Sequence, residues 1–328
     1  MSTRRGMFRL LPPLLLGMAP ARTLWAQAPA AAAFPAGPVT IVVPFPAGGS
    51  TDFVARTVAQ SLAETWKVPV VVENRVGAGG NIAADHVARA PANGQTILIG
   101  AVSTVTNPPL YKTPPYIPRV LLPVGVGVNS HLVTIARNDL PAKDMREVIA
   151  LSASRPGGLN AASAGAGTLS HLGLELLDSD HRAKINHVPY KGSAPALTDM
   201  VGGQVDIMID TITSAAPMIA AGRVKALAVH APQRSPALPS VPTYEEQGIR
   251  GMSFGAWNLF MVPEGTPADR IAALNAAMAR VVRDPATTKA FAERGLDVIV
   301  QTPAASLDFT RSDAQRWEKV IKDKNITL

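Results

Sequence analysis

The part of the sequence that most constrains the fold is the stretch 44–52, which reads PFPAGGSTD. The short run before it, residues 39–43, is rich in β-branched side chains, as in a buried strand. After it, Val54, Val58 and Leu62 recur every four residues, which predicts one apolar face of a helix. Two adjacent glycines between a strand and a helix let the backbone turn sharply and bring N–H groups close to an anion. The stretch therefore predicts either a loop that binds a carboxylate or phosphate, or an ordinary tight turn.

The first 28 residues have the pattern of an export signal. Arg4, Arg5 and Arg9 border the apolar stretch 10–19, and residues 26–28 (Ala-Gln-Ala) form a small-x-small cleavage pattern. The apolar stretch is too short to cross a bilayer as a helix, which needs about 20 residues. We therefore predict an exported, soluble, periplasmic protein. The paired arginines also resemble a twin-arginine signal, so the export route stays open.

The remaining composition excludes several classes of function. Residues 1–28 hold four arginines and no acid, so the net charge of +7 falls to about +3 without them. No cluster of lysine and arginine with interleaved aromatic residues remains, which argues against a nucleic-acid partner. The absence of cysteine rules out disulfides, thiolate metal sites and a cysteine nucleophile. A chain of this length can form two domains.

The pattern of strand, glycine loop and helix recurs at once. Residues 68–72 are predicted as a strand, 77–80 (Gly-Ala-Gly-Gly) as a loop, 81–90 as a helix and 95–101 as a third strand. Such repeats indicate a parallel sheet with helical crossovers, in which ligands bind at the carboxyl ends of the strands. Neither loop matches a nucleotide-binding motif, so no cofactor is predicted. The proline-rich residues 107–123 are predicted as an extended connection.

A similar junction occurs in the second half of the chain. The strand 159–163 leads into a loop of small residues and then into Thr168, Ser170 and His171 at the start of a helix. The two hydroxyl groups are placed to donate hydrogen bonds to an anion at the helix N-terminus. His171 could add a charge-assisted hydrogen bond, although a histidine that is merely packed or solvated is the alternative interpretation. The alternation of predicted strands and helices from about 137 to 255 predicts a second domain.

An enzyme and a signalling receptor are the rival functions. The sequence contains no G-x-S-x-G or H-E-x-x-H motif and no compact set of histidine and carboxylate side chains. Ser170 and His171 are adjacent on one helical turn, so their side chains do not face each other. Catalytic residues are therefore not predicted. A receptor that docks on a membrane sensor stays open, because transport and sensing need the same closing clamp.

Several short motifs follow one another along the chain. They are VVPFPAGG at 42–49 with Asp52, VENR at 72–75, GAGG at 77–80, GTLSHL at 167–172, HVPYKGSA at 187–194, LAV at 227–229, RSPALP at 234–239 and VPT at 241–243. In this order and spacing they resemble the Bug-type extracytoplasmic solute receptors, the binding components of tripartite tricarboxylate transporters. The resemblance covers about residues 38–328.

This resemblance implies an α/β, two-domain periplasmic-binding-protein fold of type II-like, clam-shell form. The first domain would be discontinuous (38–136 and 258–328), the second would be 137–257, and two hinge crossovers would lie near 137 and 257. It also implies a monomer without metal or cofactor, which captures a small organic carboxylate and delivers it to the permease subunits of a membrane transporter.

The resemblance maps ligand contacts onto loops of both domains. They are Phe45, Ala47, Gly48, Gly49, Ser50 and Asp52 in the first loop, Gly79, Gly80 and Asn81 in the second, and Thr168, Ser170, His171, Tyr190 and Asp210 in the second domain. The chain departs from the family pattern in two places. Residues 116–122 lack the acidic residues that family members often carry there, and Ala164 and Ala166 replace larger or polar residues, which predicts a wider cleft.

Overall fold

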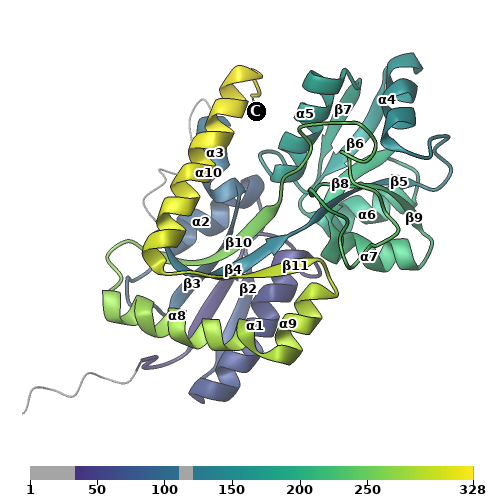
Figure 1. Cartoon of the computed structure of the whole chain (residues 1–328). Coiled ribbons are helices and arrows are strands. Elements are labelled where there is room, and N and C mark those ends of the chain that lie inside the picture. Colours follow the sequence, from purple (N-terminus) through teal and green to yellow (C-terminus); the bar gives the residue numbers. More distant parts are fainter. Residues whose placement is uncertain (1–33, 111–120, 328) are drawn as a thin grey trace, which may run out of the picture. The chain divides into compact units, whose positions relative to one another are not determined.

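The computed structural model describes residues 34–110 and 121–327, which form two β-sheets flanked by helices (Figure 1). The predicted export signal, residues 1–28, lies outside the described residues, as do residues 116–120 of the atypical stretch. Residues from both sheets line the candidate site.

The first sheet has six strands in the order β11-β4-β10-β3-β1-β2. Strand β1 pairs in parallel with β2 and β3, whereas β10 is antiparallel to β3 and β4, and β11 is antiparallel to β4. The strands are β1 (Val39–Val43), β2 (Val70–Asn74), β3 (Thr96–Ala101), β4 (Leu121–Ser130), β10 (Ala256–Pro263) and β11 (Leu296–Val300). The predicted parallel repeats at the start of the chain therefore form one edge of this sheet.

Helices cover both faces of the first sheet because successive side chains of a strand point to opposite sides. Ile41 and Val43 belong to the core beneath α1 and α8, while Val42 belongs to the core beneath α2 and α10. Figure 1 shows α1, α8 and α9 on one side of the sheet and α10, α2 and α3 on the other. The helices are α1 (Ser50–Trp66), the 3-10 turn η1 (Ala78–Gly80), α2 (Asn81–Ala88), α3 (Ser103–Leu110), α8 (Ala268–Arg283), α9 (Pro285–Ala292) and α10 (Pro303–Asp323).

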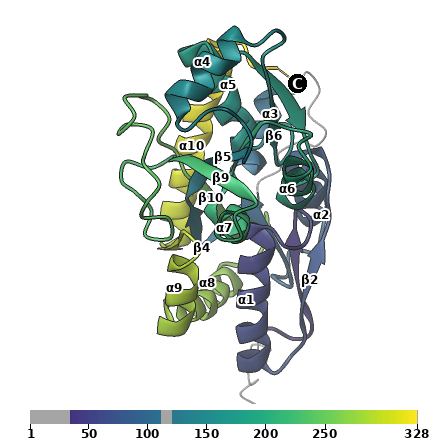
Figure 2. The same ribbon diagram turned by 90° about the vertical axis from the view of Figure 1, so that its right-hand side faces the viewer.

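The second sheet has five strands in the order β7-β6-β8-β5-β9. The strands are β5 (Leu132–Arg137), β6 (Leu159–Ser163), β7 (Ile185–Pro189), β8 (Ile207–Thr211) and β9 (Val224–Val229). The helices are α4 (Met145–Ser154), α5 (Leu169–His181), α6 (Ser193–Val201) and α7 (Ile212–Ala220). The core on one face contains side chains of α4 and α5, and the core on the other contains those of α6 and α7. Figure 2 shows these four helices around the second sheet. Both sheets are thus covered on both sides, as in α/β proteins generally.

The chain passes between the sheets twice, and the first passage corrects the sequence-based boundary. Strand β4 ends at Ser130 in the first sheet and β5 begins at Leu132 in the second, so His131 is the crossover residue. From the family resemblance we expect residues 132–136 in the first domain and the crossover near 137. An apolar run does not say which sheet it joins, and here β5 pairs with β8 and β9. The second passage spans the residues between β9 and β10, which begins at Ala256.

Candidate functional site

A cavity is lined by the first turns of α1 and α5 and by residues from strands of both sheets. It adjoins the carboxyl ends of β3 and β8 and the loops that follow β1 and β6, which is where α/β proteins bind ligands. Six of the residues predicted to bind ligand line this cavity: Phe45, Gly49, Ser50, Thr168, Ser170 and Asp210. The strand-loop-helix junctions of the two halves of the chain therefore meet at one site.

The first turn of α1 presents backbone N–H groups and two hydroxyl groups. Gly49 is the N-cap residue and has no side chain with which to cap the helix, so the first N–H groups lack an intrahelical partner. The Ser50 Oγ lies 3.0 Å from the Ser130 Oγ, and Asn258 Nδ2 donates to Thr51 Oγ1 at 3.2 Å. Strands β4 and β10 thus hold this turn in place through Ser130 and Asn258.

Asp52 fixes the first loop instead of lining the cavity. Its carboxylate accepts hydrogen bonds from Gly48 N at 3.0 Å, Arg56 Nε at 2.9 Å and Asn74 Nδ2 at 2.9 Å. Burial by itself raises the pKa of Asp52, but the bonds from Arg56, Asn74 and Gly48 hold that pKa below its ordinary value. The Gly48 N–H is therefore engaged with Asp52, and both Gly48 and Ala47 are exposed to solvent outside the cavity lining.

The second glycine loop lines a neighbouring cavity. Gly79, Gly80 and Tyr190 belong to that lining, and Phe45 and Ala164 border both cavities. The Tyr190 hydroxyl donates to Asp199 Oδ2 at 2.8 Å, and burial together with that bond raises the pKa of Tyr190 to about 12. Asn81 is buried, and its Oδ1 accepts a hydrogen bond from Asn107 Nδ2 at 3.1 Å.

The first turn of α5 also holds hydroxyl groups in the cavity wall. Thr168 is the N-cap residue, and its Oγ1 donates to Gly165 O at 2.6 Å and lies 2.9 Å from Ser170 Oγ. Ser170 Oγ in turn accepts from Ala164 N at 3.0 Å. Both hydroxyl groups therefore brace the loop and line the cavity at the same time.

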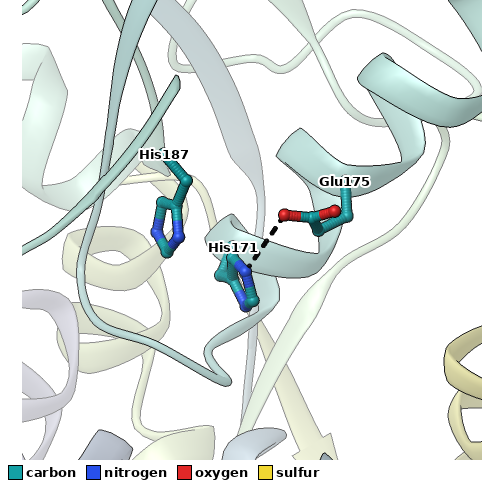
Figure 3. A group of neighbouring side chains, drawn as sticks. All are labelled: His171, Glu175 and His187. Atoms are coloured by element: carbon teal, nitrogen blue, oxygen red, sulfur yellow. Dashed lines mark ion pairs between the residues drawn. The ribbon is translucent and has the colours of Figure 1, made fainter. Parts of the chain in front are cut away.

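His171 supports this loop from behind the cavity lining, in a group with Glu175 and His187 (Figure 3). Its Nδ1 accepts from Gly167 N at 3.2 Å, and its Nε2 lies 3.3 Å from Glu175 Oε1. The His171 ring stacks on His187 with centroids 4.1 Å apart and an interplanar angle of 21°. Burial, and then the proximity of His171, lowers the pKa of His187 to about 4, so that His187 is neutral at pH 7.

The same group offers three ligand atoms within 4.8 Å of one another, which is close enough to hold a metal ion. However, an imidazole binds a metal in the plane of its ring, and two stacked rings direct their nitrogen lone pairs alongside each other. His171 Nδ1 also accepts the Gly167 N–H, and His187 Nε2 lies 2.6 Å from Ser163 Oγ. The arrangement braces the 164–168 loop, and it would have to unstack to bind a metal.

Asp210, at the end of β8, is the ionisable residue of the cavity. Its Oδ1 accepts from Ser193 Oγ at 2.6 Å and from Thr211 N at 2.8 Å, while its buried Oδ2 has no partner within the described part of the chain. Burial raises the pKa of Asp210 to about 7 despite those two bonds. No lysine, arginine or histidine is among the described residues that line the cavity. The site can therefore hold an acid through neutral donors and helix N-termini.

Several lining residues were not predicted from the sequence. They are mainly small or polar: Thr51, Ser103, Ser193, Thr211 and Asn258. Ser193 lies in the HVPYKGSA motif at the start of α6, so its position at a loop-helix junction was a usable signal. Asn258 lies within β10, far from the other residues in sequence, and only the strand pairing brings it to Thr51.

The comparison with known protein families decides the family. A model described as "Tripartite tricarboxylate transporter family receptor" matches residues 54–326. The chain belongs to this receptor family. The receptor is 35% identical to BugT of Bordetella pertussis over 298 residues, which are 90% of the receptor and 91% of BugT. The resemblance to Bug-type receptors is thereby confirmed.

Solved structures agree with this assignment. The structure of R. palustris Rpa4515 with adipate has a TM-score of 0.87 and 34% identity, covering 90% of the receptor and 99% of that chain. MatC from Rhodopseudomonas palustris with bound malate has a TM-score of 0.82 and 35% identity, covering 88% of the receptor and 100% of that chain. The two-domain, type II-like periplasmic-binding-protein fold predicted from the sequence is confirmed. Within its described residues, the receptor has no helix with both the length and the apolarity needed to cross a membrane.

Proposed function

We propose that this receptor captures a small organic carboxylate in the cavity between α1 and α5 and delivers it to the permease subunits of a membrane transporter. The observation that carries the proposal is the meeting of two helix N-termini in one cavity that contains hydroxyl groups but no cationic side chain among its described lining. A helix N-terminus favours an anion by about 0.3–1 kcal/mol at an exposed site, and by more when partly buried. The adipate and malate bound by its relatives are both small carboxylates.

The predicted site residues take three roles in this proposal. Phe45, Gly49, Ser50, Thr168, Ser170 and Asp210 contact the ligand. Ala47, Gly48, Asp52 and His171 belong to the loops that present those residues, or hold them by the hydrogen bonds described above. Gly79, Gly80, Asn81 and Tyr190 form the neighbouring region, into which a longer ligand would extend past Phe45 and Ala164.

The same geometry supports a clamp that closes on its ligand. The first domain would comprise residues up to 130 and from 256, the second the residues between, with His131 and the segment before β10 as hinges. Because only a closed form brings α1 and α5 to one carboxylate, the ligand binds that form more tightly and shifts the population towards it. The segment 1–28 would direct export to the periplasm, and the receptor would act as a monomer without catalysing a reaction.

The test is a thermal-shift screen of mono-, di- and tricarboxylates on the protein without residues 1–28, followed by calorimetry on the acids that raise the Tm. We expect at least one small carboxylate to bind. Thr168→Val combined with Ser170→Ala should weaken its binding at least tenfold, which is about 1.4 kcal/mol, the scale of one hydrogen bond to a charged group.

The matched control is Thr198→Val combined with Ser179→Ala, the same substitutions at exposed positions of α6 and α5. This control should bind as the wild type does. If none of the acids binds the wild type, or if the cavity variant binds as tightly as the control, the proposed site is wrong.

A further inference from the structure

Asp210 presents a buried carboxylate oxygen that the protein itself leaves without a hydrogen bond. Asp210 is one of the residues that line the cavity, and it is 2% exposed. Its Oδ1 is saturated by Ser193 Oγ and Thr211 N, whereas Oδ2 has no partner among the described residues. Buried polar atoms in native proteins are nearly always paired, so an unpaired oxygen on a residue that lines the cavity points to a partner that arrives with the ligand.

The backbone groups at the helix ends of the cavity are hydrogen-bond donors, whereas Asp210 Oδ2 is an acceptor. The N-termini of α1 and α5 present N–H donors, and these suit the carboxylate of the ligand. Asp210 can only accept while it is ionised, and a second carboxylate beside it would bring two like charges together. The described lining offers no cation that could neutralise such a pair. While Asp210 is ionised, the cavity is therefore asymmetric, with donors at the helix ends and an acceptor at the end of β8.

We infer that the receptor selects acids that carry a hydrogen-bond donor, such as a hydroxyl or amine, on the part remote from the bound carboxylate, and that Asp210 Oδ2 accepts from this donor. The inference rests on the proposed function and specifies its substrate class. A ligand without a donor leaves Oδ2 buried and unpaired, and therefore binds more weakly than its donor-bearing homologue of the same length.

The substitution Asp210→Asn should invert this preference. The Asn carbonyl oxygen can keep the bonds from Ser193 and Thr211, which places the amide –NH₂ where Oδ2 was. The wall of the cavity then donates instead of accepting. Hydroxy and amino acids should lose affinity at least tenfold, while dicarboxylates of the same length should gain affinity.

The experiment is calorimetry at pH 8.5 with matched probes of four carbons: butyrate, 4-hydroxybutyrate, 4-aminobutyrate and succinate. Homologous sets of three, five and six carbons allow for the unknown span of the cavity. In the wild type we expect the hydroxy or amino acid of the best-fitting set to bind at least tenfold more tightly than its unsubstituted homologue. A preference for the amine over the hydroxyl identifies a cationic donor, and equal binding identifies a neutral one; either supports the inference.

A second measurement on the wild type alone keeps the inference testable if Asp210→Asn does not fold. Because the pKa of Asp210 is about 7, the side chain is mainly protonated at pH 5.5 and its own O–H becomes a donor. The advantage of 4-hydroxybutyrate over butyrate, two monocarboxylates that titrate alike, should therefore shrink relative to pH 8.5. Ser193 of α6 and Thr211 of β8 contact Asp210, and no other Asp, Glu, Lys, Arg or His is in the described lining to titrate with it.

Asp178→Asn is the matched control, because Asp178 lies on α5 outside the cavity lining. It should keep the wild-type order of affinities. The inference is overturned if the unsubstituted acids bind as tightly as their donor-bearing homologues at every length, or if Asp210→Asn keeps the wild-type order. If no acid of any length binds, the proposed function itself fails, which is a different result.

Discussion

The backbone N–H of Gly48 donates a 3.0 Å hydrogen bond to the Asp52 carboxylate, four residues later in the chain. Asp52 also accepts from Asn74 on β2, whose Nδ2 donates to Phe45 O at 2.9 Å as well. The loop between β1 and α1 is thus tied to the neighbouring strand before any ligand arrives. This prior organisation means that Gly49 and Ser50 need little reordering to meet a carboxylate.

Asp52→Asn should destabilise the fold and weaken binding through the loop. We expect the free energy of unfolding at pH 7 to fall by about 1–3 kcal/mol, the cost of disrupting buried charge-assisted hydrogen bonds. Because the folded-state pKa of Asp52 is lowered, its contribution is present above the unfolded value of 3.8 and is lost as the pH falls through the folded value. Urea titrations at pH 7, 5 and 3 should therefore show that the difference in free energy of unfolding between the wild type and Asp52→Asn narrows below about pH 4.

Asp85→Asn provides the comparison for this variant, because it removes an Asp that pairs with Arg89 four residues along an exposed helical surface. Such pairs contribute about 0.3–0.5 kcal/mol, so the free energy of unfolding of Asp85→Asn should differ little from that of the wild type. If the two variants lose the same free energy of unfolding, Asp52 does not hold the loop.

Gly49→Val should weaken binding without straining the backbone. Gly49 has a φ of −81°, and the nearest atom to an added Cβ is Pro46 O at 3.8 Å, so the larger side chain meets the cavity and not the fold. We expect a loss of about 2 kcal/mol in calorimetry, the scale of a charge-assisted hydrogen bond left unmade. Gly48→Ala is the contrasting variant, because its φ of +89° makes it strained while its Cβ would lie in open space. It should lower the Tm and leave ligand binding nearly intact. If Gly48→Ala weakens binding and Gly49→Val does not, Gly49 does not bind the carboxylate and the loop is an ordinary turn.

Gly192→Ala should hinder closure. A Cβ at Gly192 would lie 2.5 Å from Pro46 Cδ, so the loop before α6 and the loop after β1 could not approach as closely as they do here. Small-angle scattering should then show a smaller decrease in the radius of gyration at saturating ligand than in the wild type. Gly203→Ala controls for backbone strain, because Gly203 also has a positive φ but nothing within 4 Å of the added Cβ. Wild-type compaction in Gly192→Ala would contradict this role for the contact.

His230 should make the fold sensitive to acid. It lies in the second crossover, with Nδ1 2.9 Å from Met252 O and Nε2 2.9 Å from Thr134 Oγ1, and burial lowers its pKa to about 3 although the Met252 bond raises it. A depressed histidine pKa stabilises the fold above the unfolded value of 6.5, and this stability is lost as the pH falls from 6.5 towards 3.

The variant His230→Gln keeps a donor and an acceptor but does not titrate. Its free energy of unfolding should be lower than that of the wild type at pH 7, and the difference should shrink by up to about 1.4 kcal/mol per pH unit below 6.5. If the free energies of unfolding of the two proteins change with pH in parallel, His230 is not a buried neutral base.

The sequence predicted the parts of this site that depend on local pattern. The β1-loop-α1 and β6-loop-α5 junctions were visible because a short run predicted as a strand, small residues and a hydroxyl group follow one another within about 15 residues. Five of the predicted contacts line the cavity for this reason: Phe45, Gly49, Ser50, Thr168 and Ser170. The hydrogen-bonding role of Asp52 was missed because its partner Asn74 lies on another strand.

Features that depend on distant pairing could not be predicted. The run 132–136 was recognised as a strand, but the partners β8 and β9 that place it in the second sheet come more than 70 residues later. The extended connection predicted for 107–123 was wrong at both ends, since α3 includes residues up to Leu110 and β4 begins at Leu121. There the packing of α3 against α10 outweighs the weak local helix propensity.

A crystal structure of the protein with the acid that raises its Tm most would test the proposed carboxylate site directly. We expect the carboxylate to lie between the first turns of α1 and α5, within hydrogen-bonding distance of backbone N–H groups or hydroxyls of Ser50 and Ser170. If the acid lies outside this cavity, or if lysine or arginine side chains hold its carboxylate, the proposed site is wrong.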